Sequence, residues 1–254
     1  MPVEPVLKDT VALVTGASSG IGAAAASALA ARGAAVALAA RRRDRLDELA
    51  AAIRDQGGTA LVLECDVTDQ QQAAAAVERT ASELGRLDTL VNNAGVMLLG
   101  PAAEAPLAEW QQMVQLNVLG LLYCAHAALP HLRRAAGEGP RLVADMVNIS
   151  SVAGRHARLG NGVYALTKFG VGAFSESLRQ ELAGQYVRVS LVEPGATATE
   201  LASHNRPEVL AAMQSQFGQR MEADDIADAI TYIVTRPRHV AVNEMLMRPT
   251  EQQR

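Results

Sequence analysis

The sequence predicts an α/β fold, in which one doubly wound parallel sheet is flanked by helices and the whole chain, residues 1–254, forms a single domain. Short runs of β-branched and aliphatic residues alternate along the chain with longer helical patterns. These short runs are apolar at nearly every position, as in strands that are buried on both faces. A glycine-rich turn joins the first such run to the first helical pattern.

In the first half of the chain, Val11–Thr15 is expected to be a buried strand and residues 20–32 a helix. Gly33 should end this helix, because glycine readily adopts the left-handed conformation that closes many helices. Asp44 is expected to cap the second helix, since a short carboxylate accepts from free N–H groups at a helix start. The other strands of this half are expected at residues 35–39, 60–65 and Thr89–Asn92.

The second half continues the same alternation. Helices are expected near residues 106–136 and 163–183. Strands are expected at residues 142–150, 187–193 and 243–247. Neither a linker nor an internal repeat interrupts the pattern, which supports the expectation of a single domain.

The composition argues against several classes of protein. The 254 residues include 23 Lys and Arg against 27 Asp and Glu, and this formal charge of −4 is unlike the basic excess of a general nucleic-acid binder. A hydrophobic fraction of 49% with 20% charged residues indicates a folded globule rather than disorder. Cys65 and Cys124 lack metal-ligand spacing and are expected to be buried and reduced. We expect a cytoplasmic protein without a membrane segment or a bound metal.

The glycine-rich turn has the sequence TGASSGIG, from Thr15 to Gly22. Such a turn lets the backbone approach a pyrophosphate, while the positive end of the following helix faces the negative charge. A simple tight turn is the alternative. Its position between a strand and a helix favours a dinucleotide site.

The residues after the second predicted strand bear on the choice of cofactor. A site for NAD places a carboxylate about 20 residues after the loop, where it accepts from the ribose hydroxyl. Here Ala40 is followed by Arg41, Arg42 and another arginine, whose guanidinium groups suit the 2′-phosphate of NADP(H). A solvated basic helix start is the alternative. Asp44 is the acid that opposes this assignment, but its expected capping role accounts for it.

Tyr164 and Lys168 lie four residues apart in a helical pattern, which puts both side chains on one face. A free phenol has a pKa of about 10, and a neighbouring ammonium lowers the pKa toward the range of an acid–base catalyst. A surface pair is the alternative, but Lys8 is the only other lysine in the sequence, so such a pair is uncommon by chance. Ser151 follows a predicted strand, where open α/β sheets place their sites, and Ser150 is its rival.

Taken together, these motifs resemble the short-chain dehydrogenase/reductase family over essentially the whole chain. The resemblance rests on TGASSGIG, Asp66-Val67, NNAG at residues 92–95, Asn117, NISS ending at Ser151, YALTK at residues 164–168, and Pro194-Gly195. It implies a Rossmann-like domain with a seven-stranded parallel sheet. It also implies a catalytic set of Asn117, Ser151, Tyr164 and Lys168. The implied cofactor-binding residues are Gly16, Ser18, Ser19, Gly20, Ile21, Gly22, Asp66, Val67, Asn93, Ala94, Gly95, Tyr164, Lys168, Pro194, Gly195, Thr197 and Thr199, together with Arg41 and Arg42.

The resemblance also implies roles for the catalytic set. Ser151 would polarise the substrate carbonyl, Tyr164 would donate or accept the proton, and Lys168 would lower the pKa of Tyr164 and bind the nicotinamide ribose. Asn117 would hold a water molecule that relays protons, unless it is a helix residue satisfied by the backbone. A homotetramer or homodimer is the corresponding expectation for assembly.

Finer resemblances concern the substrate. The segments NNAGVMLLGP, FSESLRQEL and MLMRPTEQ resemble the branch that contains clavulanic acid dehydrogenase, and the chain ending is similar to that of bacterial NADP-dependent 3-hydroxy acid (serine) dehydrogenases. We expect an NADPH-dependent carbonyl reductase (a ketoreductase), with specialised metabolism as one setting. The alternatives are an NADP-dependent 3-hydroxy acid dehydrogenase and a non-catalytic cofactor-binding regulator.

The substrate is expected to lie between residues 96–100, residues 152–163 and a lid at residues 196–221. Five side chains in these segments are candidates to bind a substrate carboxylate, and ordinary solvated loop residues are the alternative. They are Arg155, His156, Arg158, His204 and Arg206.

Overall fold

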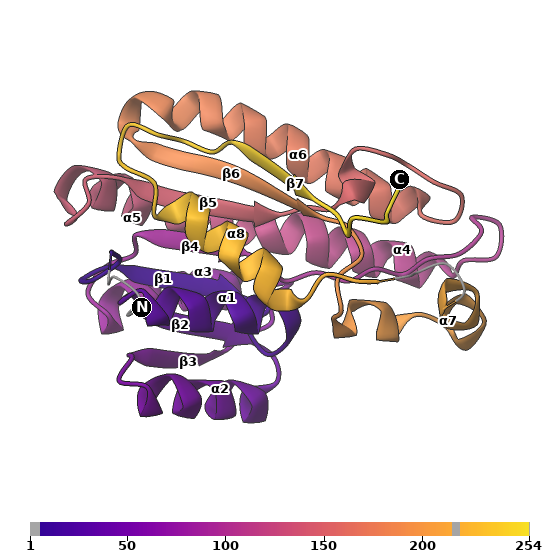
Figure 1. Cartoon of the computed structure of the whole chain (residues 1–254), viewed down its shortest axis with the longest axis horizontal. Coiled ribbons are helices and arrows are strands. Elements are labelled where there is room, and N and C mark those ends of the chain that lie inside the picture. Colours follow the sequence, from indigo (N-terminus) through magenta and orange to yellow (C-terminus); the bar gives the residue numbers. More distant parts are fainter. Residues whose placement is uncertain (1–5, 215–218, 254) are drawn as a thin grey trace.

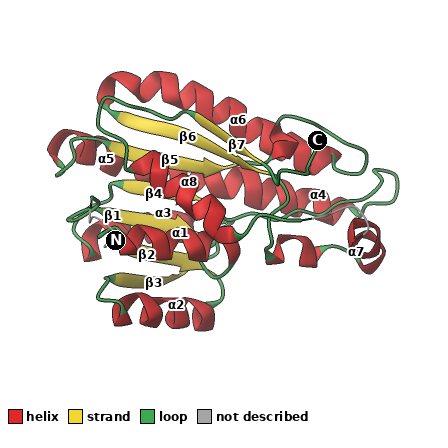
Figure 2. Ribbon diagram, in the orientation of Figure 1, coloured by secondary structure: helices red, strands yellow, loops and turns green. Residues whose placement is uncertain are grey.

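The computed structural model describes residues 6–214 and 219–253, and within them seven strands form one sheet covered by helices on both faces (Figures 1 and 2). The strand order is β3-β2-β1-β4-β5-β6-β7, and every neighbouring pair is parallel. The predicted fold class is confirmed. The order reverses direction between β1 and β4, which is the point where open α/β sheets bind their ligands.

The strands agree closely with the sequence prediction. They are β1 (Val11–Thr15), β2 (Ala35–Ala40), β3 (Ala60–Glu64), β4 (Thr89–Asn92), β5 (Ala144–Ile149), β6 (Val187–Pro194) and β7 (Glu244–Met247). The strands β1, β4, β5 and β6 are buried at every position, as expected for a sheet covered on both faces. β5 begins later than the predicted residue 142, because Leu142 has a φ of 51° and turns the chain before the strand starts.

Two layers of helices cover the sheet. One face carries α1 (Gly20–Ala31), α2 (Arg43–Asp55) and α8 (Ala223–Val234), and the other carries α3 (Gln70–Glu83), α5 (Leu121–Glu138) and α6 (Gly162–Leu182). The helix α4 (Leu107–Val114) continues through a π-helical turn, Gln115–Gly120, into α5. In Figure 1, α7 (Pro207–Gln214) lies beyond the carboxyl ends of the strands, where the arrows point.

The predicted end of α1 is confirmed, and the predicted start of α2 is wrong. Gly33, with a φ of 95°, donates to Ala30 O (2.9 Å), and Ala34 donates to Leu29 O (3.2 Å), so α1 ends as predicted. The prediction that Asp44 caps α2 is wrong, because the helix begins two residues earlier than predicted, at Arg43, with Arg42 as its cap. Asp44 lies inside the first turn, where its carboxylate still faces the positive end of the helix.

The continuous helix Leu107–Glu138 is long and apolar enough to cross a membrane by length and composition alone. Its α5 part packs against α3, β4 and β5, and Cys124 and Leu132 are fully buried there. Core helices of this kind meet the same criterion, so the criterion is weak evidence for a membrane span.

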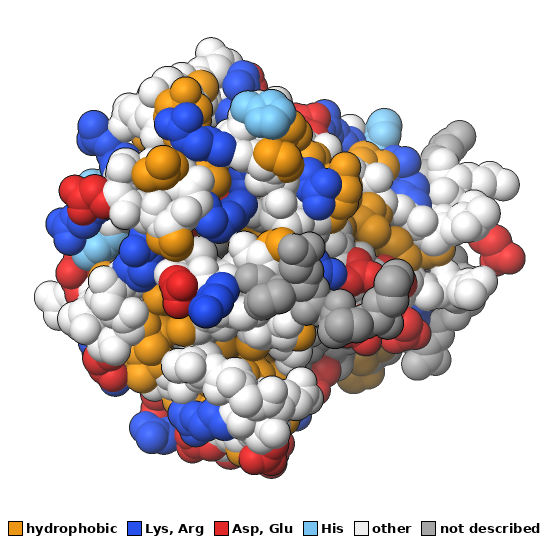
Figure 3. Space-filling model, turned by 60° about the vertical axis from the view of Figure 1, so that its left-hand side comes forward, with side chains coloured by type: hydrophobic (Ala, Val, Ile, Leu, Met, Phe, Trp, Pro, Cys, Tyr) orange, Lys and Arg blue, Asp and Glu red, His pale blue; other side chains and the backbone are white. Residues whose placement is uncertain are grey.

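Exposed charges on the molecule are extensively paired. Arg79 contacts Glu83 at 2.7 Å, and Arg179 contacts Glu176 at 2.7 Å. On the face shown in Figure 3, basic and acidic side chains are interspersed rather than gathered by sign. This face differs from the continuous basic stripe that is typical of nucleic-acid-binding domains.

Candidate active site

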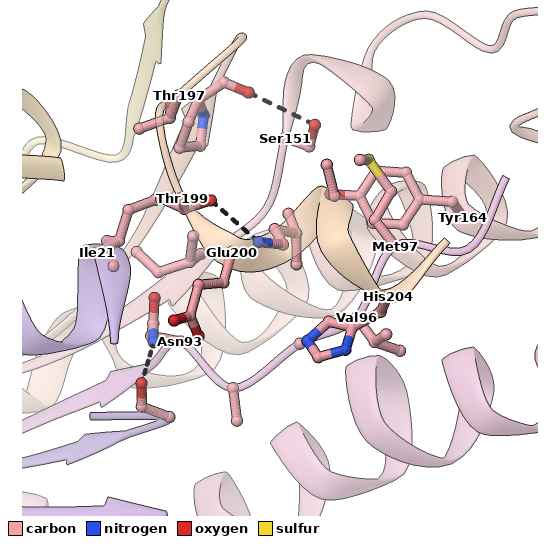
Figure 4. A pocket seen from close by; sticks show the side chains of 18 of the residues that line it. Ile21, Asn93, Val96, Met97, Ser151, Tyr164, Thr197, Thr199, Glu200 and His204 are labelled. Carbon is pink, nitrogen blue, oxygen red and sulfur yellow. Dashed lines mark hydrogen bonds between the residues drawn. The ribbon is translucent and has the colours of Figure 1, made fainter. Parts of the chain in front are cut away.

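A pocket of about 440 Å³ lies at the carboxyl ends of the strands and is closed on one side by the segment that follows β6. Figure 4 shows Ile21, Asn93 and Glu200 toward one end of this pocket and Ser151 and Tyr164 toward the other. Most of the predicted cofactor and catalytic residues line it, namely Gly16, Ser18, Ser19, Gly20, Ile21, Arg41, Arg42, Asp66, Val67, Asn93, Ala94, Gly95, Ser151, Tyr164, Lys168, Pro194, Gly195, Thr197 and Thr199. Gly22 and Asn117 are the two predicted residues outside the lining.

Two glycines of the loop need conformations that other residues rarely adopt. Gly16 has a φ of 66° and Gly20 a φ of 53°. Gly22 serves packing instead, because a Cβ at this position would lie 2.4 Å from the carbonyl oxygen of Gly16. Gly22 therefore brings α1 close to the loop from behind and does not face the pocket.

The loop end of the pocket fits a dinucleotide cofactor. Ser19 caps α1 without a hydrogen bond between its side chain and the backbone of the first turn, and this turn holds no acidic residue, so the helix start can receive an anion. Asn93 ties β4 to the loop by donating from its amide nitrogen to Thr15 O (2.9 Å) and Gly16 O (3.2 Å). The glycine-rich loop is thereby fixed at the switch point of the sheet.

At the other end of the pocket, α6 presents Tyr164 and Lys168 one turn apart, with 5% and 7% of their surfaces exposed. Lys168 Nζ donates to Ile149 O at 2.8 Å and lies 5.9 Å from the centre of the Tyr164 ring. Burial raises the pKa of Tyr164 to about 12, opposed by a side-chain hydrogen bond with Ser151. Burial lowers the pKa of Lys168 to about 8.

The raised pKa of Tyr164 differs from the sequence expectation, in which the ammonium of Lys168 lowers it. Burial of the phenol is the largest cause of the shift, and the ammonium of Lys168 makes its hydrogen bond to the carbonyl oxygen of Ile149 rather than to the phenol. Loss of water around the phenol then determines the direction of the shift.

The structure separates the two candidate serines. Ser150 is buried and donates to Lys168 O at 3.1 Å, so its hydroxyl supports α6. Ser151 accepts from Ala153 N (3.1 Å) and donates to Pro194 O over a longer 3.4 Å, which leaves its hydroxyl easier to redirect toward a substrate. This geometry favours Ser151 as the substrate-facing residue.

Asn117 lies in the π-helical turn, behind the pocket wall and 2% exposed. Its amide accepts from Val96 N (2.8 Å) and donates to Val96 O (2.9 Å) and to Thr167 Oγ1 (3.2 Å). The alternative of an asparagine satisfied by the backbone therefore describes its contacts. A Cβ on Gly95 would lie 3.3 Å from Asn117 Oδ1 and 3.8 Å from Lys168 Nζ, so both groups flank that glycine.

The basic segment after β2 pairs with an acidic residue from the segment after β6, a contact that sequence reasoning missed. Arg42 donates to Ser18 Oγ (2.9 Å) and Ser19 Oγ (2.7 Å), and its Nη1 pairs with Glu200 at 2.8 Å. Arg45 pairs with the other oxygen of Glu200 at 2.6 Å. Glu200 lines the pocket, and its separation from Arg42 by 158 positions explains why no local pattern reveals the contact.

The substrate end of the pocket includes three of the five candidate carboxylate-binding residues, His156, Arg158 and His204. Arg155 lies outside the lining because Glu193 (2.7 Å) and Glu244 bind its guanidinium. Arg206 is likewise outside it and pairs with the carboxylates of Glu109 and Glu208.

Besides the Glu200 contacts, the predicted lid is held by side-chain hydrogen bonds at Asn205 and at Ala196. Asn205 accepts from Leu99 N (2.7 Å) and donates to Met97 O (2.8 Å) across the substrate end. At the other anchor, Gln252 near the chain end accepts from Ala196 N at 2.9 Å, a contact that sequence reasoning also missed. Residues 215–218 of the predicted lid lie outside the described residues.

Within residues 6–214 and 219–253, no group of three or more His, Cys, Asp or Glu side chains is placed to hold a metal ion. Burial raises the pKa of Cys65 to about 11 and that of Cys124 to about 12, so both thiols stay protonated at neutral pH.

Comparison of the sequence with known proteins identifies a family. A family model described as short chain dehydrogenase matches residues 10–210. The chain is 34% identical over 249 residues to an uncharacterized oxidoreductase of Staphylococcus saprophyticus, covering 97% of this chain and 98% of that protein. It is 41% identical over 248 residues to the glycine betaine reductase ATRR of Emericella nidulans. This match covers 97% of this chain but only 19% of the length of that much longer protein.

Solved structures agree with this result. The closed form of serine dehydrogenase complexed with NADP+ is 30% identical and superposes with a TM-score of 0.87, covering 96% of this chain and 97% of its own. A 3-ketoacyl-(acyl-carrier-protein) reductase from Brucella melitensis complexed with NADH is 27% identical with a TM-score of 0.83, covering 95% of this chain and 97% of its own. Similar structures thus include complexes with either nicotinamide cofactor.

Proposed function

The chain belongs to the short-chain dehydrogenase family, and on this premise we propose that it is an NADPH-dependent reductase that converts an aldehyde or ketone into an alcohol. The observation that carries the proposal is one pocket lined by Ser151, Tyr164 and Lys168 at one end and by the glycine-rich loop and Arg42 at the other. When bound, NADPH supplies a hydride. The side chains of the protein polarise the carbonyl and provide the proton.

The contacts at the catalytic end support these roles. Ser151 exchanges its long bond to Pro194 O for a bond to the substrate oxygen and so stabilises the negative charge that develops there. Tyr164, with a pKa of about 12, is protonated at neutral pH, which is the state that a proton donor in reduction requires. The ammonium of Lys168 stabilises the phenolate that remains after proton transfer.

Asn117 acts as a positioning residue in this proposal. Its amide fixes the backbone of Val96 in the pocket wall and, through Thr167, the turn of α6 between Tyr164 and Lys168. The space beside Gly95, which Asn117 Oδ1 and Lys168 Nζ flank, is where we place a water molecule that returns protons to Tyr164.

The preference for NADP(H) rests on the arginines. Arg41 and Arg42 line the pocket after β2, and the described residues at the end of that strand include no carboxylate in the lining. The serine dehydrogenase complex with NADP+ supports the same choice. The similar structure with NADH gives no reason to favour NADPH, so the choice depends on this chain's own basic residues.

The test is consumption of NADPH in the presence of a panel of aldehydes and ketones. We expect turnover of at least one carbonyl, and a loss of about 100-fold or more in Tyr164→Phe with unchanged binding of NADP+. Tyr232→Phe is the matched control, since this tyrosine is exposed on α8 and outside the pocket lining. Unchanged turnover in Tyr164→Phe would reject Tyr164 as the proton donor.

A second candidate function is NADP-dependent oxidation of short 3-hydroxy acids. It is favoured by the similarity to serine dehydrogenase and by His156, Arg158 and His204 in the lining, which carry or can acquire positive charge. Slow or absent turnover of serine-like substrates with NADP+ would count against it. Cofactor binding without activity on either panel would instead favour a non-catalytic regulator.

Assembly and organisation belong to the same proposal. We place the whole chain in one cytoplasmic domain, with residues 196–221 as its lid, and expect a homotetramer or homodimer. Exposed apolar side chains on α4 and α6 support contact between copies there, since Leu107 is 64%, Leu166 61% and Phe169 45% exposed. Light scattering coupled to size exclusion measures the molar mass and tests this expectation.

A further inference from the structure

Three charged side chains form a bridge over the cofactor end of the pocket. One oxygen of Glu200 lies 2.8 Å from Arg42 Nη1, and the other lies 2.6 Å from Arg45 Nη1. Glu200 begins the 3₁₀ turn Glu200–His204, directly after Thr199 in the segment that closes the pocket. The bridge therefore joins the basic end of β2 and α2 to the start of the lid.

Arg42 is held in a fixed orientation by the glycine-rich loop. Its Nε and Nη2 donate to Ser18 Oγ (3.1 and 2.9 Å), and Nη2 also donates to Ser19 Oγ (2.7 Å). A guanidinium has five N–H donors, and these contacts leave Nη1 as the edge open to an anion. Glu200 occupies this edge.

The carboxylate of Glu200 is a persistent anion. The two guanidinium groups lower the pKa of Glu200 to about 2, with the hydrogen bond from Arg42 as the largest cause and that from Arg45 as the next. Glu200 is thus negatively charged throughout the neutral range. A second anion at Nη1 of Arg42 meets both steric and electrostatic competition from it.

Resting on the NADP(H) assignment above, we propose that Glu200 is a cofactor-discriminating residue, whose carboxylate competes within the molecule with the 2′-phosphate of NADP(H) for Arg42 and Arg45. Binding of the phosphorylated cofactor releases Glu200 from Arg42. Binding of NAD(H), which has no phosphate at this position, leaves the bridge intact. The apparent affinity for the 2′-phosphate is reduced by the fraction of molecules in which the bridge is closed.

Two cofactor fragments isolate this effect without turnover. Adenosine 2′,5′-bisphosphate carries the 2′-phosphate, and adenosine 5′-monophosphate lacks it. We expect calorimetry to show that Glu200→Gln binds the bisphosphate about threefold to tenfold more tightly than the unaltered protein, because the bridge consists of two partly exposed ion pairs. Binding of the monophosphate should stay within about twofold.

Glu208→Gln is the matched control. Glu208 lies eight positions further along the chain and pairs with Arg206 at 3.1 Å, outside the pocket lining. Its substitution removes the same charge from the neighbouring segment without touching Arg42. A second control adds Arg42→Ala to Glu200→Gln. This double variant should lose most of the gain in affinity for the bisphosphate, because the competition acts through the guanidinium of Arg42.

The possible outcomes separate the two proposals. Equal binding of the bisphosphate by Glu200→Gln and Glu208→Gln would overturn the competition. Weaker binding by Glu200→Gln would also overturn it, and would make Glu200 a support that holds the arginines in place for the phosphate. Failure of both the unaltered protein and Glu200→Gln to distinguish the two fragments would overturn the NADP(H) assignment itself.

Discussion

The two ends of the pocket are held by different kinds of contact. At the catalytic end, Lys168 donates to the backbone of Ile149, Ser150 donates to the backbone of Lys168, and all of these side chains are buried. At the cofactor-phosphate end, Arg42 and Glu200 pair side chain to side chain and remain about 40% and 44% exposed. Buried bonds to fixed backbone groups preorganise chemistry, whereas exposed ion pairs can exchange one partner for a ligand.

The largest expected effect tests the catalytic end through its two adjacent serines. Ser151→Ala should lower kcat about 10²- to 10³-fold, because it removes the donor aimed at the developing oxyanion. Ser150→Ala is its neighbour control. This change should leave kcat within about threefold and cost about 1 kcal/mol of stability, since it breaks a buried bond to Lys168 O. Steady-state kinetics and urea unfolding measure both, and a reversed order would exchange the roles of the two serines.

A smaller effect tests the phosphate end through its two adjacent arginines. Arg42→Ala should weaken binding of NADP+ about tenfold or more and leave binding of NAD+ within about twofold, because a charged donor to the phosphate is lost. Arg41→Ala should have the weaker effect, since among the described residues its exposed guanidinium makes no hydrogen bond that fixes it. Equal losses with both cofactors would contradict the assignment of this end to the 2′-phosphate.

The smallest expected effect concerns pH. The pKa of Lys168 is about 8, below its ordinary value, so Lys168 loses its positive charge as the pH rises above 8. Tyr164, with a pKa of about 12, stays protonated over that range. The kcat/KM for reduction should therefore be level well below pH 8, be lower by about half at pH 8 and continue to fall above it.

The variant Lys168→Arg tests whether the fall in kcat/KM at high pH comes from Lys168. Arginine keeps its charge, so the fall above pH 8 should disappear in the variant. Turnover at neutral pH should still be lower than in the unaltered protein, because the planar guanidinium does not reproduce the compact ammonium beside Ile149 O. A profile that stays unchanged in this variant would mean that another group titrates near pH 8.

The comparison of the two ends also explains what the sequence could predict. Strands such as Val11–Thr15 were predictable because their apolar runs are a local property, and so was the facing pair of Tyr164 and Lys168. The partners of these residues were not, because Glu200 and Ile149 are brought to them by the tertiary fold. The predicted lowering of the pKa of Tyr164 is wrong for the same reason, because burial of the phenol depends on everything that the tertiary fold packs around it.

The helical stretch Leu107–Glu138 contains the π-helical turn Gln115–Gly120, and this turn restricts how many residues the stretch can have. One additional residue in a helical turn rotates all that follows by about 100° relative to an uninterrupted α-helix. With this rotation, Met113 before the turn and Cys124 after it are both buried, while Asn117 faces Val96. A substitution in the turn alters one side chain, whereas deletion of a single residue would rotate α5 about its own axis and present a different face of the helix to the sheet. The spacing between Met113 and Cys124 is thus a constraint on variation in its own right, separate from the identity of the residues that fill it.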